Sequence, residues 1–223
     1  MIYIYMNEFT LGYISGFAQT IIGHPLDTIK TNFQAKKSIY PITIRNLYRG
    51  VIPPLLGNSC VVSLHFGLND TLNPYLWNNN FISGFFAGLG GSIILNPMEL
   101  YKVRAQNRIT PIYINPLYGL LPTMGRETLG ISVYFGTYHY LFDNGICNSL
   151  LAGGISGWMS WLISYPLDVI KTRIQSNRAN TIIEAYHQKH LWKGFGICSV
   201  RSVIVNGLGF YIYQHIKDLE KNM

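Results

Sequence analysis

Charged residues are scarce in this chain. Only 12% of its 223 residues are charged, whereas soluble domains average about a quarter. Hydrophobic residues make up 48%, and the net charge of +7 comes from Lys and Arg that mostly avoid the apolar segments. This composition argues against an ordinary soluble domain and favours a polytopic membrane protein.

Several functional signatures are also missing. Cys60, Cys147 and Cys198 lie far apart, without a CxxC pair or a histidine cluster of zinc spacing, so we expect buried free thiols, no metal and no cofactor. We find no phosphate loop, nucleophile elbow or convergent catalytic triad, which argues against an enzyme. The first ten residues, MIYIYMNEFT, contain no Lys or Arg and resemble neither a secretory signal nor a transit peptide.

Long apolar segments are present instead. Each approaches or exceeds the roughly 20 residues that a bilayer core requires. Each also carries Gly, Pro or polar residues, as expected for helices that line a shared polar cavity. The sequence therefore predicts an all-α membrane protein with six transmembrane helices, at about 8–33, 52–76, 79–105, 120–142, 147–174 and 196–219.

One unit occurs three times. The stretches HPLDTIKTNFQ, NPMELYKVRAQ and YPLDVIKTRIQ share a proline, an acid, a base and a glutamine in register, with two glycines upstream. Six matching positions in a single chain indicate triplication. The shared positions are Pro25, Pro97 and Pro166; Asp27, Glu99 and Asp168; Lys30, Lys102 and Lys171; Gln34, Gln106 and Gln175; Gly12, Gly84 and Gly153; and Gly16, Gly88 and Gly157.

These positions have a mechanical interpretation on membrane helices. Glycines four residues apart share one helix face and permit close packing, and a proline kinks the helix. The acid and the base, three residues apart, also share a face. Three kinked helices could thus bring three acids and three bases into one ring, where pairing offsets an insertion cost of ~3 kcal/mol per charge.

Lys and Arg are distributed unevenly between the connections. Thirteen of the seventeen lie in 30–49, 102–108 and 171–193, and none lies in 73–80 or 142–148. This asymmetry predicts three long loops on one side of the membrane and both termini on the other. A soluble helical solenoid would also explain the repeat, but it explains neither the asymmetry nor the low charge content.

The repeated motifs, with the downstream YRG and WKG, resemble the signature of the mitochondrial carrier family over about residues 8–219. The resemblance implies a single domain, 1–223, with threefold pseudosymmetry and repeats at about 7–76, 79–143 and 147–220. It also implies the inner mitochondrial membrane, alternating access and no cleaved presequence. By this resemblance a matrix gate consists of the pairs Asp27–Lys102, Glu99–Lys171 and Asp168–Lys30, braced by Gln34, Gln106 and Gln175.

The resemblance further implies lipid sites where an aromatic-basic-glycine step begins an even-numbered helix. Arg49-Gly50 and Lys193-Gly194 match this step, and a phosphate of cardiolipin could meet the helix amides there. An ordinary interfacial aromatic with a snorkelling base is the alternative. Leu117-Tyr118-Gly119 lacks the base. We expect a monomer whose partners are lipid and a small-molecule substrate, with no nucleic acid polymer.

The second gate of the family, on the cytosolic side, is degenerate in this sequence. The expected pattern is aromatic-acid-x-x-base, and no full ring of ion pairs can form from the residues present. We expect this gate to depend on hydrogen bonds and apolar contacts. The residues at these places are Asn69-Asp70 with Asn73, Tyr138-His139 with Phe142, and Tyr213-Gln214 with Lys217.

Substrate contacts should lie between the two gates, on polar side chains of the even-numbered helices. The candidates are Arg126, Glu127, Arg201, Asn206, His65 and Asn69. Adjacent Arg and Glu resemble the contact site of amino acid carriers, and a related pattern that of acylcarnitine carriers. A nucleotide exchanger is the runner-up, because arginines could bind a phosphate, and a proton or ion leak protein is the third interpretation. Two simpler alternatives stay open: Arg126 and Glu127 pair only with each other, and His65 is a satisfied pore histidine.

Overall fold

The computed structural model describes residues 7–34, 43–48, 51–106, 115–192 and 194–221. Within these ranges, side chains are described except at 27–34, 46, 53, 102, 104–106, 197, 220 and 221. The described residues are helical or in turns, and no strand occurs among them. The predicted all-α class is thereby confirmed.

Six long helices correspond to the six predicted segments: α1 (Glu8–Gln34), α3 (Ile52–Leu72), α4 (Asn80–Gln106), α5 (Leu120–Asp143), α6 (Ser149–Gln175) and α8 (Phe195–Lys221). The short elements are α2 (Ile44–Leu47), the 3-10 turn η1 (Asn73–Tyr75) and α7 (Ile182–His187). The predicted end of the second segment, residue 76, is too late. The α-helix stops at Leu72 and passes into η1, because Pro74 has no backbone N–H with which to continue the α-helical hydrogen bonds.

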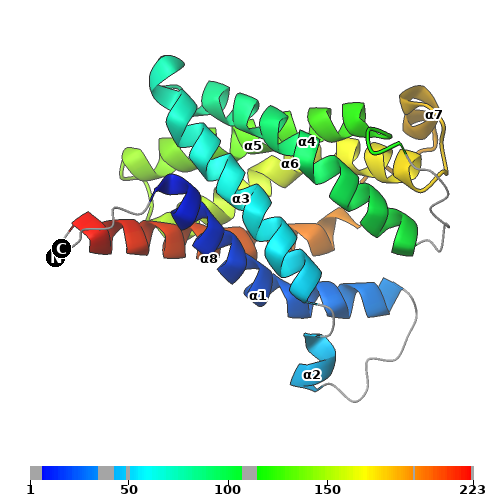
Figure 1. The fold of residues 1–223 in the computed structure, drawn as a ribbon, viewed down its shortest axis with the longest axis horizontal. Helices are drawn as coiled ribbons and strands as arrows, with labels where there is room; N and C mark the ends of the chain where they lie inside the picture. The colour runs from blue at the N-terminus through cyan, green and yellow to red at the C-terminus, as the bar shows by residue number, and fades with distance from the viewer. Residues whose placement is uncertain (1–6, 35–42, 49–50, 107–114, 193, 222–223) are drawn as a thin grey trace.

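The long helices form a closed ring. Each packs against the next long helix along the chain, and α8 returns to pack against α1. Figure 1 shows α1 and α8, from opposite ends of the chain, crossing each other. At one end of the ring, Lys217 near the end of α8 donates to Glu8 in the first turn of α1, with Nζ 2.5 Å from Oε1. The ring therefore has a central axis toward which all six helices can direct side chains.

An asparagine precedes each of the helices α1, α4 and α6. The side-chain oxygens of Asn7, Asn79 and Asn148 accept backbone N–H bonds from the first turn, at 3.4, 2.9 and 3.0 Å. Such caps satisfy amides that have no partner inside the helix. Each asparagine stands 18 residues before the repeated proline, so the cap extends the register of the repeat by one more position.

The repeated glycines allow α1, α4 and α6 to approach the helices that follow them. A Cβ on Gly88 would lie 2.5 Å from the backbone oxygen of Glu127, and one on Gly153 would lie 2.8 Å from that of Asn206. The other repeated glycines face the next helix in the same way: Gly12 and Gly16 on α1, Gly84 on α4 and Gly157 on α6. The predicted packing role of these glycines is confirmed.

The repeated prolines, Pro25, Pro97 and Pro166, lie inside α1, α4 and α6. A proline there removes one backbone hydrogen bond, so the kink remains the expectation at each position. By length and apolarity, one stretch of the described residues, Asn80–Tyr101 in α4, is suited by itself to cross a membrane, with a mean hydropathy of 1.4.

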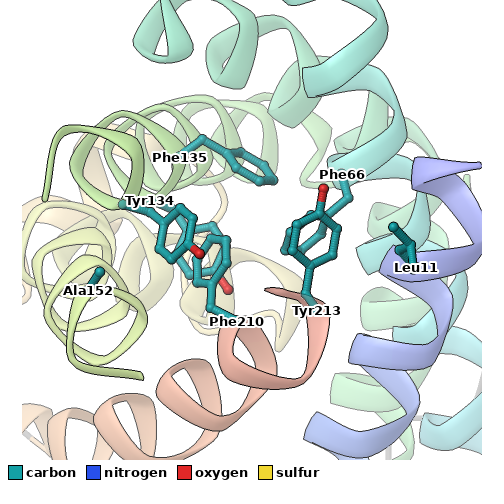
Figure 2. Packing of buried hydrophobic residues seen from close by; sticks show 8 residues of the cluster. Leu11, Phe66, Tyr134, Phe135, Ala152, Phe210 and Tyr213 are labelled. Atoms are coloured by element: carbon teal, nitrogen blue, oxygen red, sulfur yellow. The ribbon is translucent and has the colours of Figure 1, made fainter. Parts of the chain in front are cut away.

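Aromatic side chains from α3, α5 and α8 pack together inside the ring (Figure 2). One of them, Tyr213, also bonds Glu8, so they lie near the Glu8–Lys217 end. Tyr138 of α5 stacks on Phe210 of α8, with ring centroids 3.5 Å apart. Phe66 of α3 packs edge-on against Phe135 and Phe210, at 5.0 and 5.3 Å. We call these residues, together with their neighbours, the aromatic cluster: Leu11, Phe66, Tyr134, Phe135, Tyr138, Ala152, Phe210 and Tyr213.

Candidate functional site

The acid and base of the repeated motif meet between α4 and α6. Lys171 donates from its ammonium to Glu99, and the Lys171 side chain is almost fully buried. This contact joins two helices that follow each other in the predicted ring of pairs. Glu99 and Lys171 are one of the three pairs predicted for the matrix gate.

Arg126 on α5 extends this contact into a cluster of charges. Its Nη2 lies 3.2 Å from Glu99 Oε2, its Nε lies 3.6 Å from Asp168 Oδ1, and it also contacts the adjacent Glu127. One guanidinium thus faces three carboxylates that come from three helices. An exclusive pair of Arg126 and Glu127 does not describe this arrangement.

A cavity of about 130 Å³ lies between the charge cluster and the aromatic cluster. Arg126 and Glu127 line it, with side chains only 11% and 7% exposed. The remaining lining residues are uncharged or are a histidine: Gln19, Val62, His65, Phe66, Gly130, Ile131, Tyr134, Ser160, Trp161, Ser164 and Asn206. The cavity therefore holds one cation and one carboxylate in a largely apolar and aromatic wall.

His65 on α3 also lines the cavity and approaches Glu127. Its Nε2 lies 3.7 Å from Glu127 Oε2, and this nitrogen is buried without a hydrogen-bond partner. The ring lies against Gly91 of α4, where any Cβ would collide with it. A satisfied pore histidine, the alternative considered above, would need a hydrogen bond on Nε2, and none occurs among the described residues.

The other predicted contact residues have different surroundings. Asn206 lines the cavity and donates to Ser202 Oγ at 2.9 Å. Asn69 is turned toward α4, where it donates to Asn80 at 3.3 Å and accepts from Ser83 at 2.8 Å. Arg201 approaches Gly23 of α1, and neither Asn69 nor Arg201 is among the described residues that line the cavity.

Residues of α1 and α6 also form part of the wall, although the sequence pattern directed attention only to the second, fourth and sixth predicted segments, which are α3, α5 and α8. Gln19 and Trp161 are the clearest examples. Their signal was available, because each follows the second glycine of the repeat by three or four residues. A residue at that spacing lies near the glycine face of its helix.

The end of the ring that carries the degenerate motif is held by hydrogen bonds, apolar contacts and an ion pair. Lys217 and Tyr213 of α8 both bond Glu8 of α1. His139 contacts Asp143, and Gln214 donates to Asp218, each within its own helix. The aromatic cluster lies directly beside these residues.

Gln175, predicted as a brace, donates to Asn96 Oδ1 at 3.1 Å. Gly194, predicted at a lipid site, has a left-handed φ of +92° just before α8, and Gly119 has one of +76° before α5. Other predicted positions lie outside the described residues or side chains: Asp27, Lys30, Gln34, Lys102, Gln106, Arg49, Gly50 and Lys193.

Comparison with known proteins identifies the family. The sequence profile of the family described as mitochondrial carrier protein matches residues 4–43 and 142–223. Mitochondrial substrate carrier family protein L of Dictyostelium discoideum is 30% identical over 94% of this chain and 94% of its own length. This chain belongs to the mitochondrial carrier family.

Two further relatives carry substrate names. The human mitochondrial basic amino acids transporter is 30% identical over 85% of this chain and 80% of its own. The mitochondrial arginine transporter BAC2 of Arabidopsis thaliana is 29% identical over 93% and 89%. As a member of the family, this mitochondrial carrier is a transport protein of the inner mitochondrial membrane. The expected family and location are confirmed.

Proposed function

We propose that this carrier transports an amino acid with a cationic side chain. The observation that carries the proposal is the pairing of Arg126 and Glu127, two buried side chains of opposite charge in the wall of one cavity. A substrate carboxylate would bind Arg126, and a substrate cation would bind Glu127. The names of the human and Arabidopsis relatives agree with this substrate class.

Arg126 would also connect the substrate to the matrix gate. In the structure its guanidinium faces Glu99 and Asp168, which are the acidic residues of the second and third copies of the repeated motif. A substrate carboxylate that binds Arg126 competes with these two acids. The competition weakens the contacts that hold α4, α5 and α6 together. Substrate binding therefore favours opening of the proposed matrix gate.

The full architecture that we infer has six transmembrane helices in three repeats, at about 7–76, 79–143 and 147–220, working as a monomer by alternating access. The gate on the matrix side comprises Asp27–Lys102, Glu99–Lys171 and Asp168–Lys30 with their three glutamines. Similar contacts in successive repeats support this architecture. Ser63 and Ser132 both donate to a backbone oxygen near the start of the preceding helix, at 2.5 and 2.7 Å.

Cardiolipin is the proposed lipid partner at Arg49-Gly50 and Lys193-Gly194. The left-handed backbone at Gly194 supports a turn that leads the chain directly into the first amides of α8. A helix start of this kind suits a lipid phosphate. Vesicles with and without cardiolipin would show whether this lipid raises the thermal stability of the purified carrier.

A nucleotide substrate fits this cavity less well. Glu127 repels phosphates, and a nucleotide would bring several negative charges to a site where Arg126 already faces three carboxylates and the substrate offers no cation to Glu127. Carnitine-like substrates keep a carboxylate and a fixed cation and remain compatible with Arg126 and Glu127. The cationic group of an amino acid can donate N–H hydrogen bonds to Glu127, whereas the quaternary ammonium of a carnitine-like substrate has no N–H to donate.

The test is uptake of radiolabelled arginine, lysine, carnitine, glutamate and dATP into liposomes that hold the purified carrier. We expect arginine and lysine to be exchanged, and Glu127→Gln to reduce their exchange by about tenfold or more, since losing one buried charged partner costs several kcal/mol. Asp143→Asn on the same helix, outside the cavity, is the matched control. Exchange of dATP that Glu127→Gln leaves intact, without competition by amino acids, would refute the proposal.

A further inference from the structure

The histidine beside Glu127 has no part in the substrate contacts of Arg126 and Glu127. The His65 side chain is 7% exposed, and its Nε2 is buried without a hydrogen-bond partner while lying 3.7 Å from a carboxylate oxygen. A proton on Nε2 would turn this approach into a charge-assisted interaction with Glu127. The position of His65 is therefore suited to a proton that is present in one step of the cycle and absent in another.

The surroundings of His65 leave Glu127 as its main electrostatic partner. From α5 it faces Glu127 and Arg126, with the Tyr134 hydroxyl further along the same wall. From α4 it meets Gly91, which has no side chain. The other helices contribute described wall residues that are uncharged, namely Gln19 of α1, Ser160, Trp161 and Ser164 of α6, and Asn206 of α8.

Glu127 in turn shares the positive charge of Arg126 with two other carboxylates. That guanidinium also faces Glu99 and Asp168, and Lys171 adds its charge at Glu99 rather than at Glu127. The side chains of Lys30 and Lys102 lie outside the described part of the chain. Within the described part, a second positive partner for Glu127 can come from the cavity or from the imidazole of His65.

We propose that a proton on His65 and the cationic group of the substrate alternate as this second positive partner of Glu127. The inference rests on the proposed amino acid function. When the cationic group occupies the cavity, it binds Glu127 and His65 is neutral. When the substrate leaves, His65 takes up a proton from the same side, and the carrier returns with that proton.

The consequence is exchange of one cationic amino acid for one proton. Both loaded forms bring one positive charge to Glu127, so the site crosses the membrane with the same charge in either direction. Uptake of arginine would therefore export a proton from the vesicle. Arginine–arginine exchange would not need His65, because the substrate itself supplies the cation on both passages.

The experiment uses liposomes that hold the full chain, a trapped pH-sensitive dye and external radiolabelled arginine. With no internal amino acid, arginine uptake by the wild type should raise the internal pH. A gradient of about two pH units, acid inside, should drive accumulation toward an upper limit of about 100-fold, since one pH unit equals tenfold in proton activity. His65→Gln should abolish the pH change and the response to the gradient. In this variant the ratio of arginine–arginine exchange to net arginine uptake should therefore rise well above that of the wild type.

His215→Gln is the matched control, because His215 lies on α8 in a stack with Tyr211, outside the cavity. It should behave like the wild type. If His65→Gln does not insert, His65→Asn serves the same purpose with a shorter amide. In either variant, proton movement that continues with arginine uptake overturns the proposal.

The wild type alone also separates the two proposals. If it transports arginine without any change in internal pH and without response to the gradient, the proton role of His65 is wrong while the proposed substrate class stands. If it transports no amino acid at all, the proposed function fails, and the role of His65 fails with it. The two failures are therefore distinguishable in one set of vesicles.

Discussion

Reversing the charges of Glu99 and Lys171 should restore only part of the transport that either single reversal removes. Lys171→Glu places a second acid beside Glu99 in a buried setting, where breaking a charge pair costs about 3–5 kcal/mol. Because about 1.4 kcal/mol is tenfold in a rate, we expect arginine exchange to fall by about 100-fold or more. Adding Glu99→Lys rebuilds the contact with opposite polarity.

The rebuilt contact is incomplete because Glu99 has a second partner. Arg126 Nη2 lies 3.2 Å from Glu99 Oε2, a distance at which two unit charges interact by about 5 kcal/mol at an effective dielectric constant of 20. In the double variant this attraction becomes repulsion between Lys and Arg. We therefore expect the double variant to recover clearly above the single one but to stay at least about tenfold below the wild type.

The assay is exchange of radiolabelled arginine, normalised to the amount of carrier inserted in the vesicles. Asp218→Lys reverses a charge near the end of α8, where Asp218 is exposed and accepts a hydrogen bond from Gln214 of the same helix, so it serves as the control. Full recovery in the double variant would show that Arg126 does not contact Glu99 during transport. A double variant as inactive as Lys171→Glu, at equal insertion, would refute the Glu99–Lys171 pairing itself.

Three further predictions concern the frame around the site. Phe210→Ala opens a gap in the aromatic cluster, where such truncations cost about 3–5 kcal/mol of stability. This variant should let protons leak through the carrier without substrate, as measured with a trapped pH-sensitive dye, whereas Tyr211→Ala, on the exposed side of α8, should not. Gly88→Ala should lower the unfolding temperature in detergent because its Cβ would lie 2.5 Å from the Glu127 carbonyl oxygen, whereas Gly196→Ala meets nothing within 4 Å and should be tolerated. Asn148→Ala removes the cap of α6 and should cost about 1 kcal/mol, seen as a drop of a few degrees in the same measurement, and an unchanged unfolding temperature would contradict that capping role.

Much of the helical frame was predictable because it follows from local composition. Apolar length, the repeated proline and the loop charges placed six helices whose observed ends, such as Gln34, Asp143 and Gln175, lie within one or two residues of the expected ones. The end of α3 at Leu72 was placed four residues too late, at 76, since a long apolar run obscured the break imposed by Pro74. The asparagine caps were also missed, although Asn7, Asn79 and Asn148 keep the register of the repeat.

The site was less predictable, because a one-dimensional pattern does not give the rotation of a helix about its own axis. Asn69 and His65 stand one turn apart on α3, yet Asn69 bonds Asn80 and Ser83 of α4 while His65 lines the cavity. The contacts of Arg126 with Glu99 and Asp168 join three helices, and nothing in the local sequence around any of them specifies that meeting.

The return of α8 to α1 has a consequence for the order in which the protein can assemble. The last helix supplies Asn206, Phe210 and Lys217 to the axis, and it packs on both α6 and the first helix. Until it inserts, five helices form an open crescent whose concave face presents Arg126 and Glu127 to lipid. Insertion of the final helix is therefore the step that converts an exposed polar face into an enclosed one, and truncations that remove it should be recognised and degraded rather than accumulate as partly active carriers.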